Sequence, residues 1–444
     1  MKRRMLGLRL MTMILVWLSS AAAMSPNPGG PSIRLDGKLN YPCIGSDGGT
    51  AYLQVSVVTT SQPIPDRPHL NLAVVLDRSG SMAEEGKMQN AKAALRALID
   101  QLDDDDIFSL VIYDDVVDVI RPAARVGSKQ QLKCLVDEVY PRGWTNLGAG
   151  MLEGYAQVTH YARPRLTNRV VLLSDGLANR GITDLSELSG IARSYRNRSI
   201  SLTTMGVGLD YNENLMLALS ECGGGNYYFI ESARNIAAVM QSEFRRLSCV
   251  LAQNACIHFS LGHDVRVIDI IGAEGRSVTD RYDIPVGDLY AGQRREFTVV
   301  LDIPPGSGTM TVVSGWLTYE SEMAGFGHPT FAAKVRYTRD LAERDRNRDM
   351  DIQAKGDIAL STRGVERAMK ALDAGRPEEA AAAIAGAKDV LSASPAMGSD
   401  AGAVIRVQSL KLDEYKATVN NRSIDGRKVK KSIQYDNYRT QQQQ

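Results

Sequence analysis

The sequence predicts an α/β domain, built on a parallel sheet with helices on both faces. We expect this domain to be inserted in or flanked by a β-sandwich and followed by an α-helical region. Three observations support this fold class. Residues 70–247 alternate continuous apolar runs with helical periods, as parallel sheets covered by helices do. Short strand-like segments lie before and after that stretch, at residues 32–60 and 248–338. Beyond residue 340 the chain reads as two or three helices.

The composition is that of an ordinary globular protein, and it excludes several classes of function. The chain has 444 residues, enough for two or three domains, and is 44% apolar and 23% charged. Its 52 Lys and Arg residues nearly balance 51 Asp and Glu, for a formal net charge of +1. This balance argues against a dedicated nucleic-acid binder, which would be strongly basic, and against an acidic disordered protein.

Residues 1–23 read as a secretory signal peptide. Basic residues at positions 2–4 precede the mostly apolar run LMTMILVWL, and an Ala-x-Ala-like site follows at residues 21–23. The run is too short to cross a bilayer, although an uncleaved anchor is the alternative. No later segment approaches 18 consecutive apolar residues. We therefore expect an exported chain, periplasmic or extracellular, with no transmembrane span in its mature form.

The five cysteines form no zinc-binding or redox pattern. An exported chain could use them in one or two disulfides with a thiol left over, and buried thiols are the alternative. Their spacing does not decide the pairing. The cysteines are Cys43, Cys134, Cys222, Cys249 and Cys256.

The parts of the chain are expected in a simple order. The N-terminal strands would struggle to fold alone, so we expect them to share one β-sandwich with the later strands; two small β domains are the alternative. The expected parts are a Pro/Gly linker at 24–31 within the N-terminal strand segment 24–69, the α/β domain at 70–247, β-sandwich strands at 248–340, a helical region at 341–425 and a flexible basic tail at 426–444.

The elements of the α/β domain follow from periodicity. Strands are expected at residues 71–76, 107–113, 116–121, 169–173 and 201–206, and helices at 87–102, 129–139, 147–159, 185–195 and 235–247. In the C-terminal region, the alanine-rich residues 365–392 predict a helical hairpin broken at Gly375-Arg376-Pro377.

A candidate metal site lies at the carboxyl ends of the expected strands, where ligand-binding groups collect in parallel α/β folds. Asp77, Ser79 and Ser81 follow the first strand, Thr145 precedes a helix, and Asp175 follows the strand RVVLL. These five side chains offer only oxygen ligands, with no His or Cys. Such a set favours Mg²⁺, Ca²⁺ or Mn²⁺ over zinc or copper, with Mg²⁺ first.

These motifs resemble the metal-ion-dependent adhesion site of von Willebrand factor type A domains. The DxSGS segment, the threonine of WTN and the aspartate of SDG match all five positions of that site. The resemblance covers residues 70–247 and is strongest to bacterial exported members similar to the calcium-activated chloride channel and inter-alpha-trypsin inhibitor heavy chain groups. Residues 285–304 fit the sandwich that follows the domain in that group. Without a membrane span, the resemblance implies no channel activity.

The resemblance implies a non-enzymatic adhesion or scaffold module whose cation captures an Asp or Glu of a protein partner. One alternative is an envelope-assembly protein in which the metal only stabilises loops. A metal-assisted hydrolase is a weaker alternative, because phosphatases with a nucleophilic aspartate after the first strand need a second Asp where Ser79 stands. The five histidines form no catalytic grouping. The sequence leaves oligomeric state open.

Overall fold

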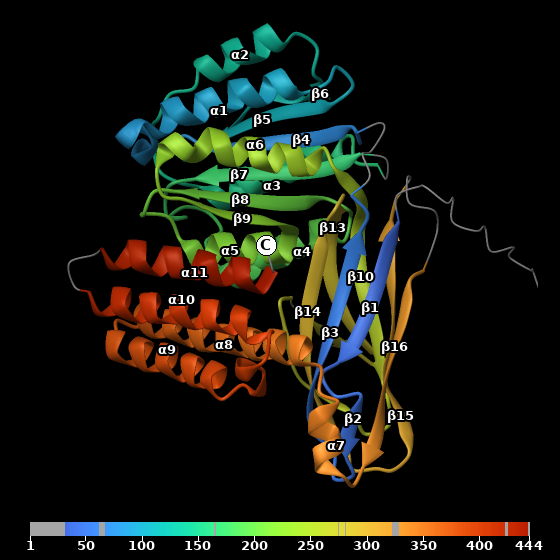
Figure 1. Ribbon diagram of the computed structural model, residues 1–444. Coiled ribbons are helices and arrows are strands. Elements are labelled where there is room, and N and C mark those ends of the chain that lie inside the picture. The colour runs from blue at the N-terminus through green and yellow to red at the C-terminus, as the bar shows by residue number, and fades with distance from the viewer. Residues whose placement is uncertain are drawn as a thin grey trace, which may run out of the picture.

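Strands in three sheets and helices around them make up the part of the chain that is described (Figure 1). The computed structural model describes residues 32–61, 67–163, 166–273, 275–279, 281–321, 328–421 and 425–442. The signal peptide and linker expected within residues 1–31 lie outside these ranges. In the view of Figure 1 the α/β domain is at the top, the sandwich at the lower right and the C-terminal helices at the lower left.

The α/β domain is a six-stranded sheet in the order β6-β5-β4-β7-β8-β9, with helices on both faces. Its strands are β4 (Leu70–Asp77), β5 (Ile107–Tyr113), β6 (Val117–Arg125), β7 (Thr167–Ser174), β8 (Ser201–Val207) and β9 (Gly224–Ile230). Its helices are α1 (Lys87–Gln101), α2 (Lys129–Asp137), α3 (Leu147–Thr159), α4 (Leu185–Arg196), α5 (Glu213–Gly223) and α6 (Ile236–Leu247). The predicted fold class is confirmed.

The central strand β4 explains why both faces of this sheet carry helices. All eight of its residues are buried, and successive side chains point to opposite faces. Leu72 and Val74 join the core formed with α1, α2 and α6, whereas Ala73 and Val75 join the core formed with α3, α4 and α5. A continuous apolar strand is therefore covered on both sides.

One edge of the sheet differs from the expected parallel arrangement. Strand β6 pairs antiparallel with β5, while the other neighbouring pairs of this sheet are parallel. The reason is the short connection of residues 114–116, which can close a hairpin but cannot make the long crossover that parallel strands require.

The strand segments before and after the α/β domain form one β-sandwich. Strand β3 pairs with β14 over ten residues, from Val58 opposite Arg294 to Gly49 opposite Ile303, and β2 pairs with β16. The sheets run β1-β3-β14-β11 and β12-β13-β10-β15-β16-β2. Their strands are β1 (Ile33–Leu39), β2 (Cys43–Gly45), β3 (Gly49–Thr59), β10 (Val250–Leu261), β11 (Arg266–Ile271), β12 (Arg276–Val278), β13 (Arg281–Tyr290), β14 (Arg294–Ile303), β15 (Thr309–Glu320) and β16 (Thr330–Thr338).

The C-terminal helices pack against one another and against the sandwich. They are α7 (Leu341–Arg346), α8 (Met350–Asp373), α9 (Pro377–Ser392), α10 (Gly402–Asn420) and α11 (Gly426–Gln442). The expected break between α8 and α9 is present: Gly375 has φ of 69° and Pro377 is the first residue of α9. Tyr52 of β3 donates a hydrogen bond to Asp357 of α8 at 2.9 Å, which ties this helix to the sandwich.

The expectation of a flexible tail at residues 426–444 is wrong for residues 426–442, which form helix α11. Val429 and Ile433 join the core of the C-terminal helices, whereas Tyr438 joins the core of the α/β domain. The basic character of the segment suggested a solvated end. Two of its lysines are instead buried, because they meet carboxylates from distant parts of the chain.

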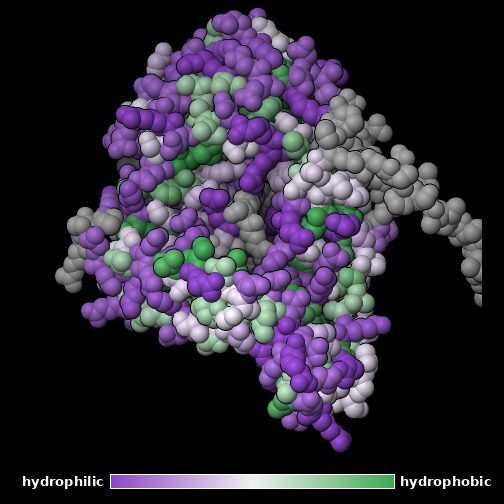
Figure 2. Space-filling model, viewed as in Figure 1, coloured by the Kyte–Doolittle hydropathy of each residue, from purple (hydrophilic) through white to green (hydrophobic). Residues whose placement is uncertain are grey.

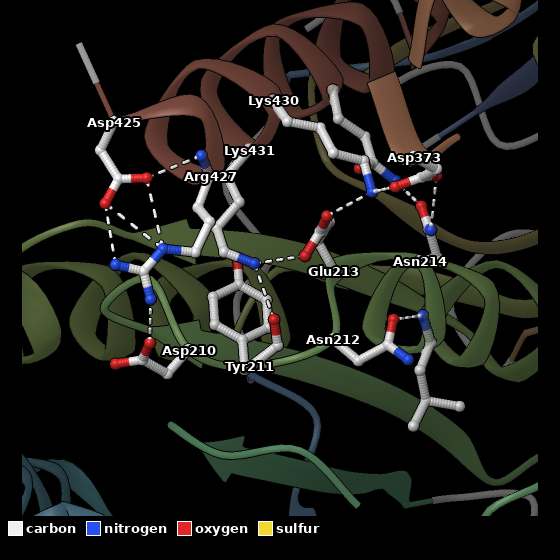
Figure 3. Close-up of polar contacts among 12 residues, drawn as sticks. Asp210, Tyr211, Asn212, Glu213, Asn214, Asp373, Asp425, Arg427, Lys430 and Lys431 are labelled. Carbon is white, nitrogen blue, oxygen red and sulfur yellow. Dashed lines mark hydrogen bonds and ion pairs between the residues drawn. The ribbon is translucent and has the colours of Figure 1, made fainter. Parts of the chain in front are cut away.

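Figure 3 shows how α11 is held to the loop between β8 and α5. Lys431 donates to Glu213 and, at 2.7 Å, to the Tyr211 carbonyl oxygen. Lys430 pairs with Glu213 at 2.5 Å and also with Asp373 of α8. Burial raises the pKa of Glu213, but the hydrogen bonds from Lys430 and Lys431 outweigh this effect. The pKa of Glu213 therefore lies below its usual value. This junction joins the α/β domain to the C-terminal helices.

The five cysteines are free thiols. No disulfide joins any of the five cysteines, all of which lie within the described ranges.

Among the helices that the structure describes, none has the length and apolar character needed to span a bilayer. The face in Figure 2 is mostly polar; a small apolar patch lies over α10, where Val404, Val407 and Leu410 are exposed.

Candidate metal centre

The candidate centre lies at the carboxyl edge of the α/β sheet, as the motifs predict. Strands β4 and β7 are parallel neighbours, with Leu76 opposite Leu173. The residues that follow this pair, Asp77 at the end of β4 and Asp175 just after β7, therefore come to the same edge. Both aspartates are completely buried.

Asp77 is held by hydrogen bonds to both carboxylate oxygens. Its Oδ1 accepts from the Ser79 backbone N–H at 2.8 Å, and its Oδ2 accepts from the Ser174 hydroxyl at 2.6 Å. Burial raises the pKa of Asp77 to about 6, although the hydrogen bonds from Ser174 and Ser79 oppose that shift. No described side chain provides a cationic partner for this carboxylate in an ion pair.

The two serines connect Asp77 to Asp175. The hydroxyl oxygens of Ser79 and Ser81 are 3.1 Å apart, and the Ser81 hydroxyl donates to Asp175 Oδ1 at 2.7 Å. Ser79 is buried. The DxSGS segment therefore places the Ser81 hydroxyl on the second carboxylate and the Ser79 hydroxyl beside that of Ser81.

Thr145 reaches the same place from the loop before α3. A Cβ atom added at Gly176 would lie 3.1 Å from the Thr145 hydroxyl oxygen and 3.7 Å from that of Ser81. Both hydroxyls therefore flank one glycine. The Thr145 N–H donates to the Asn179 side chain at 3.0 Å, which fixes the loop. The structure thus brings together all five predicted residues.

The sequence interpretation missed Lys87, the first residue of α1. Its ammonium group lies 2.8 Å from Asp175 Oδ2, and the residue is only 3% exposed. A sequence signal was available: Lys87 lies four residues before Ala91, in line with the apolar stripe of α1. A lysine on a buried helical stripe implies a buried carboxylate partner.

Arg78 was also missed, although it lies within the motif. It is 7% exposed, and its Nε lies 2.9 Å from Asp114 Oδ2. Burial raises the pKa of Asp114, but the Val116 N–H, Arg142 and Arg78 lower it to a net value below the usual one. This network fixes the loop that follows β4.

The donor set suits a hard divalent cation. Three hydroxyls and two buried carboxylates offer oxygen atoms only, and Lys87 balances one of the two negative charges. Within the described residues, no cluster of three or more His, Cys, Asp or Glu side chains is placed to hold a metal ion. A centre made mainly of hydroxyl oxygens is consistent with that finding, because hydroxyls are not among those residue types.

Similar proteins share this domain. Residues 71–242 match the family model of the von Willebrand factor type A domain. The uncharacterized protein YfbK of Escherichia coli (strain K12) is 28% identical over 248 residues, 54% of this chain and 43% of the relative. Inter-alpha-trypsin inhibitor heavy chain H3 of Mesocricetus auratus is 26% identical over 37% of this chain and 20% of the relative. The chain thus covers less than two thirds of the length of these relatives.

Two solved structures resemble this chain over more than its α/β domain. A von Willebrand factor type A protein from Catenulispora acidiphila matches with a TM-score of 0.71 at 14% identity, over 95% of this chain and 98% of the other. The ArnB paralog VWA2 from Sulfolobus acidocaldarius matches with a TM-score of 0.57 at 19% identity, over 91% and 98%. At such identities the likeness shows the fold alone. The family match thus identifies residues 71–242 as a von Willebrand factor type A domain, and these solved structures share the fold of the chain.

Proposed function

We propose that the chain is an exported, non-enzymatic module that binds an acidic side chain of a protein partner through a divalent cation. Von Willebrand factor type A domains commonly mediate protein–protein contacts, and they commonly hold such a cation. The observation that carries the proposal is the contact between Ser79, Ser81 and Asp175, next to a second buried carboxylate, Asp77.

The chemistry of the centre supports Mg²⁺ as the cation. The hydroxyls of Ser79, Ser81 and Thr145 would hold it, while Asp77 and Asp175 would orient these hydroxyls and bound water. When bound, the cation supplies a positive charge that neutral hydroxyls do not cancel. A carboxylate from a partner is the natural ligand for that charge.

The surface beside the centre supports a protein partner. Trp144, next to Thr145, is 56% exposed, and Leu177, next to Gly176, is 55% exposed. The Arg180 guanidinium lies over the Trp144 ring, 5.2 Å from its centroid. Exposed Trp and Arg side chains are typical of the residues that contribute most to protein interfaces.

A crosslinking pull-down from envelope extract tests this proposal. The bait is the wild-type chain, Asp77→Asn, or Asp105→Asn as a control at an exposed aspartate, each with Mg²⁺ and with EDTA. We expect the same specific proteins with wild type and control in Mg²⁺, and their loss in EDTA and with Asp77→Asn. Equal recovery under all of these conditions would contradict the proposal.

Export has its own test. Mass spectrometry of the chain from the envelope fraction should find Met24 as the first residue if the signal peptide is cleaved after Ala23. An intact N-terminus on a chain recovered from the cytoplasm would contradict the exported part of the proposal and leave the metal-dependent part standing.

A further inference from the structure

A cavity of about 630 Å³ lies where the α/β domain, the sandwich and the C-terminal helices meet. The α/β domain contributes Arg196 and the start of β9, and the sandwich contributes β11, β13 and Arg295 of β14. Helices α8 and α11 close it with Arg363 and Tyr438. Its volume is within the range of sites that bind small molecules.

Arg196 and Arg295 stand out among its charged groups. Arg196 Nη1 donates to the Glu221 carbonyl oxygen at 3.3 Å, and a Cβ atom at Gly224 would lie 2.8 Å from Arg196 Nε. The Arg295 guanidinium lies over the Phe297 ring, 5.6 Å from its centroid. Among the described residues, neither arginine forms an ion pair.

The other charges of the cavity wall are engaged. Arg363 donates to Asp269 at 2.8 and 2.9 Å and to both oxygens of Glu366 at 3.0 Å. Those two carboxylates are therefore already paired with a guanidinium. Glu221 also lines the cavity, so its wall carries three arginines and three carboxylates. Within the described residues, Arg196 and Arg295 are the arginines of this wall that form no ion pair.

A third arginine, Arg169, shows how neighbouring carboxylates change the pKa of a buried guanidinium group. Arg169 is completely buried, yet Tyr290, Asp288 and Glu243 outweigh the effect of burial and raise its pKa above the usual value. At Arg196 the balance is reversed: burial, with Arg295 adding to it, lowers the pKa to about 10. Burial also lowers the pKa of Arg295. Two like charges of one cavity wall that form no ion pair within the described residues are unfavourable unless a bound anion compensates them.

We propose that this cavity binds the oxyanion group of a small molecule, a phosphate or a carboxylate, between the guanidinium groups of Arg196 and Arg295. The planar fork of a guanidinium matches both groups with paired hydrogen bonds. Val286, Ile270 and Tyr282 in the cavity wall offer apolar surface to the rest of the molecule. The site is separate from the candidate metal centre and does not depend on it.

Thermal unfolding and calorimetry of the full chain test this inference, with divalent cations removed on a chelating resin. The probes are inorganic phosphate and acetate at constant ionic strength, which distinguish the two head groups. The variants are Arg196→Gln and Arg295→Gln, and the control is Arg34→Gln, an exposed arginine on β1 of the same sheet as Arg295.

We expect at least one probe to raise the Tm of wild type and control saturably, and each cavity variant to weaken its Kd at least tenfold. Without a probe, the cavity variants should be no less stable than wild type, because each loses a guanidinium charge that has no ion-pair partner in the described chain. An arginine with a purely structural role would show the opposite, a loss of stability without a change in Kd.

The wild-type protein alone provides a second measurement. Phosphate or acetate should protect Arg196 and Arg295 from modification by phenylglyoxal, mapped by mass spectrometry, and should leave Arg34 reactive. Absence of saturable binding and of protection with both probes would overturn the inference. Equal binding by wild type and both cavity variants would do so as well.

Discussion

The junction at helix α11 and the candidate metal centre each combine buried lysine with a buried carboxylate, and they differ in charge balance. At the junction of Figure 3, Lys430 and Lys431 face Glu213 and Asp373, so two positive charges meet two negative ones. At the candidate metal centre, Lys87 alone faces Asp175, and Asp77 has no cationic partner in the described chain.

The difference separates a structural contact from a binding site. A balanced cluster needs nothing more, and it holds α11 against the α/β domain. A cluster that lacks one positive charge is unfavourable until a cation is present. The cavity at Arg196 and Arg295 is the reverse case, because the groups that lack an ion-pair partner there are positively charged. Charge balance therefore predicts which buried polar groups hold the fold together and which await a ligand.

The largest expected effect comes from breaking the balanced cluster. Glu213→Gln leaves Lys431 buried without its carboxylate, and removing one partner of a buried pair costs about 3 kcal/mol. The free energy of opening of α11, measured by amide hydrogen exchange, should fall by about that amount. Added Mg²⁺ should not restore it. Lys388→Gln, which breaks an exposed pair with Asp413, is the control and should have little effect.

Breaking the pair at the metal centre should give a different response. Lys87→Met keeps the volume of the side chain and leaves both Asp175 and Asp77 without a cationic partner. Without divalent cations the variant should be less stable than wild type. The metal centre of the variant carries more net negative charge than that of the wild type. We therefore expect about tenfold tighter Mg²⁺ binding and a greater Mg²⁺-dependent rise in Tm than in the wild type.

Lys92→Met, at a partly exposed lysine on the same helix that lies away from Asp175, is the control for that variant. It should bind Mg²⁺ as the wild type does. If Lys87→Met and Lys92→Met show the same Mg²⁺-dependent rise in Tm, the proposed charge deficit at the centre is wrong.

The smallest effect is the pH dependence of the junction. The folded-state pKa of Glu213 lies below its usual value of 4.5, so its charge stabilises the fold above that pH. This contribution is lost as the pH falls through the lowered, folded-state pKa. The difference in α11 opening between wild type and Glu213→Gln should thus be constant near neutrality and shrink progressively below pH 4.5. A difference that grows on acidification would contradict this sign.

The sequence predicted the α/β fold, and it predicted that the five candidate side chains meet at one edge of the sheet, because both depend on local patterns. Apolar runs mark strands that are buried on both faces, and polar residues directly after such strands must meet at one edge. Asp77, Ser79 and Ser81 are neighbours in sequence. Their relation to Asp175 follows from the parallel pairing of β4 with β7.

The features that the sequence did not predict depend on contacts between distant residues. Lys431 and Glu213 are 218 positions apart, and nothing near either residue reveals the other. The basic segment was therefore read as a mobile tail, although its lysines are paired and buried. The cavity arginines are not detectable for the same reason, since the cavity and their lack of an ion pair within the described residues appear only when three parts of the chain are packed together.

Calorimetric titration with Mg²⁺ tests the central claim most directly, with wild type, Asp77→Asn and the exposed-site control Asp105→Asn. We predict that wild type and control each bind one Mg²⁺ per chain. Asp77→Asn should bind it about 100-fold more weakly or not at all, while remaining at least as stable without the cation. No saturable binding to the wild type, or equal binding by Asp77→Asn, would contradict a metal centre at this edge of the sheet.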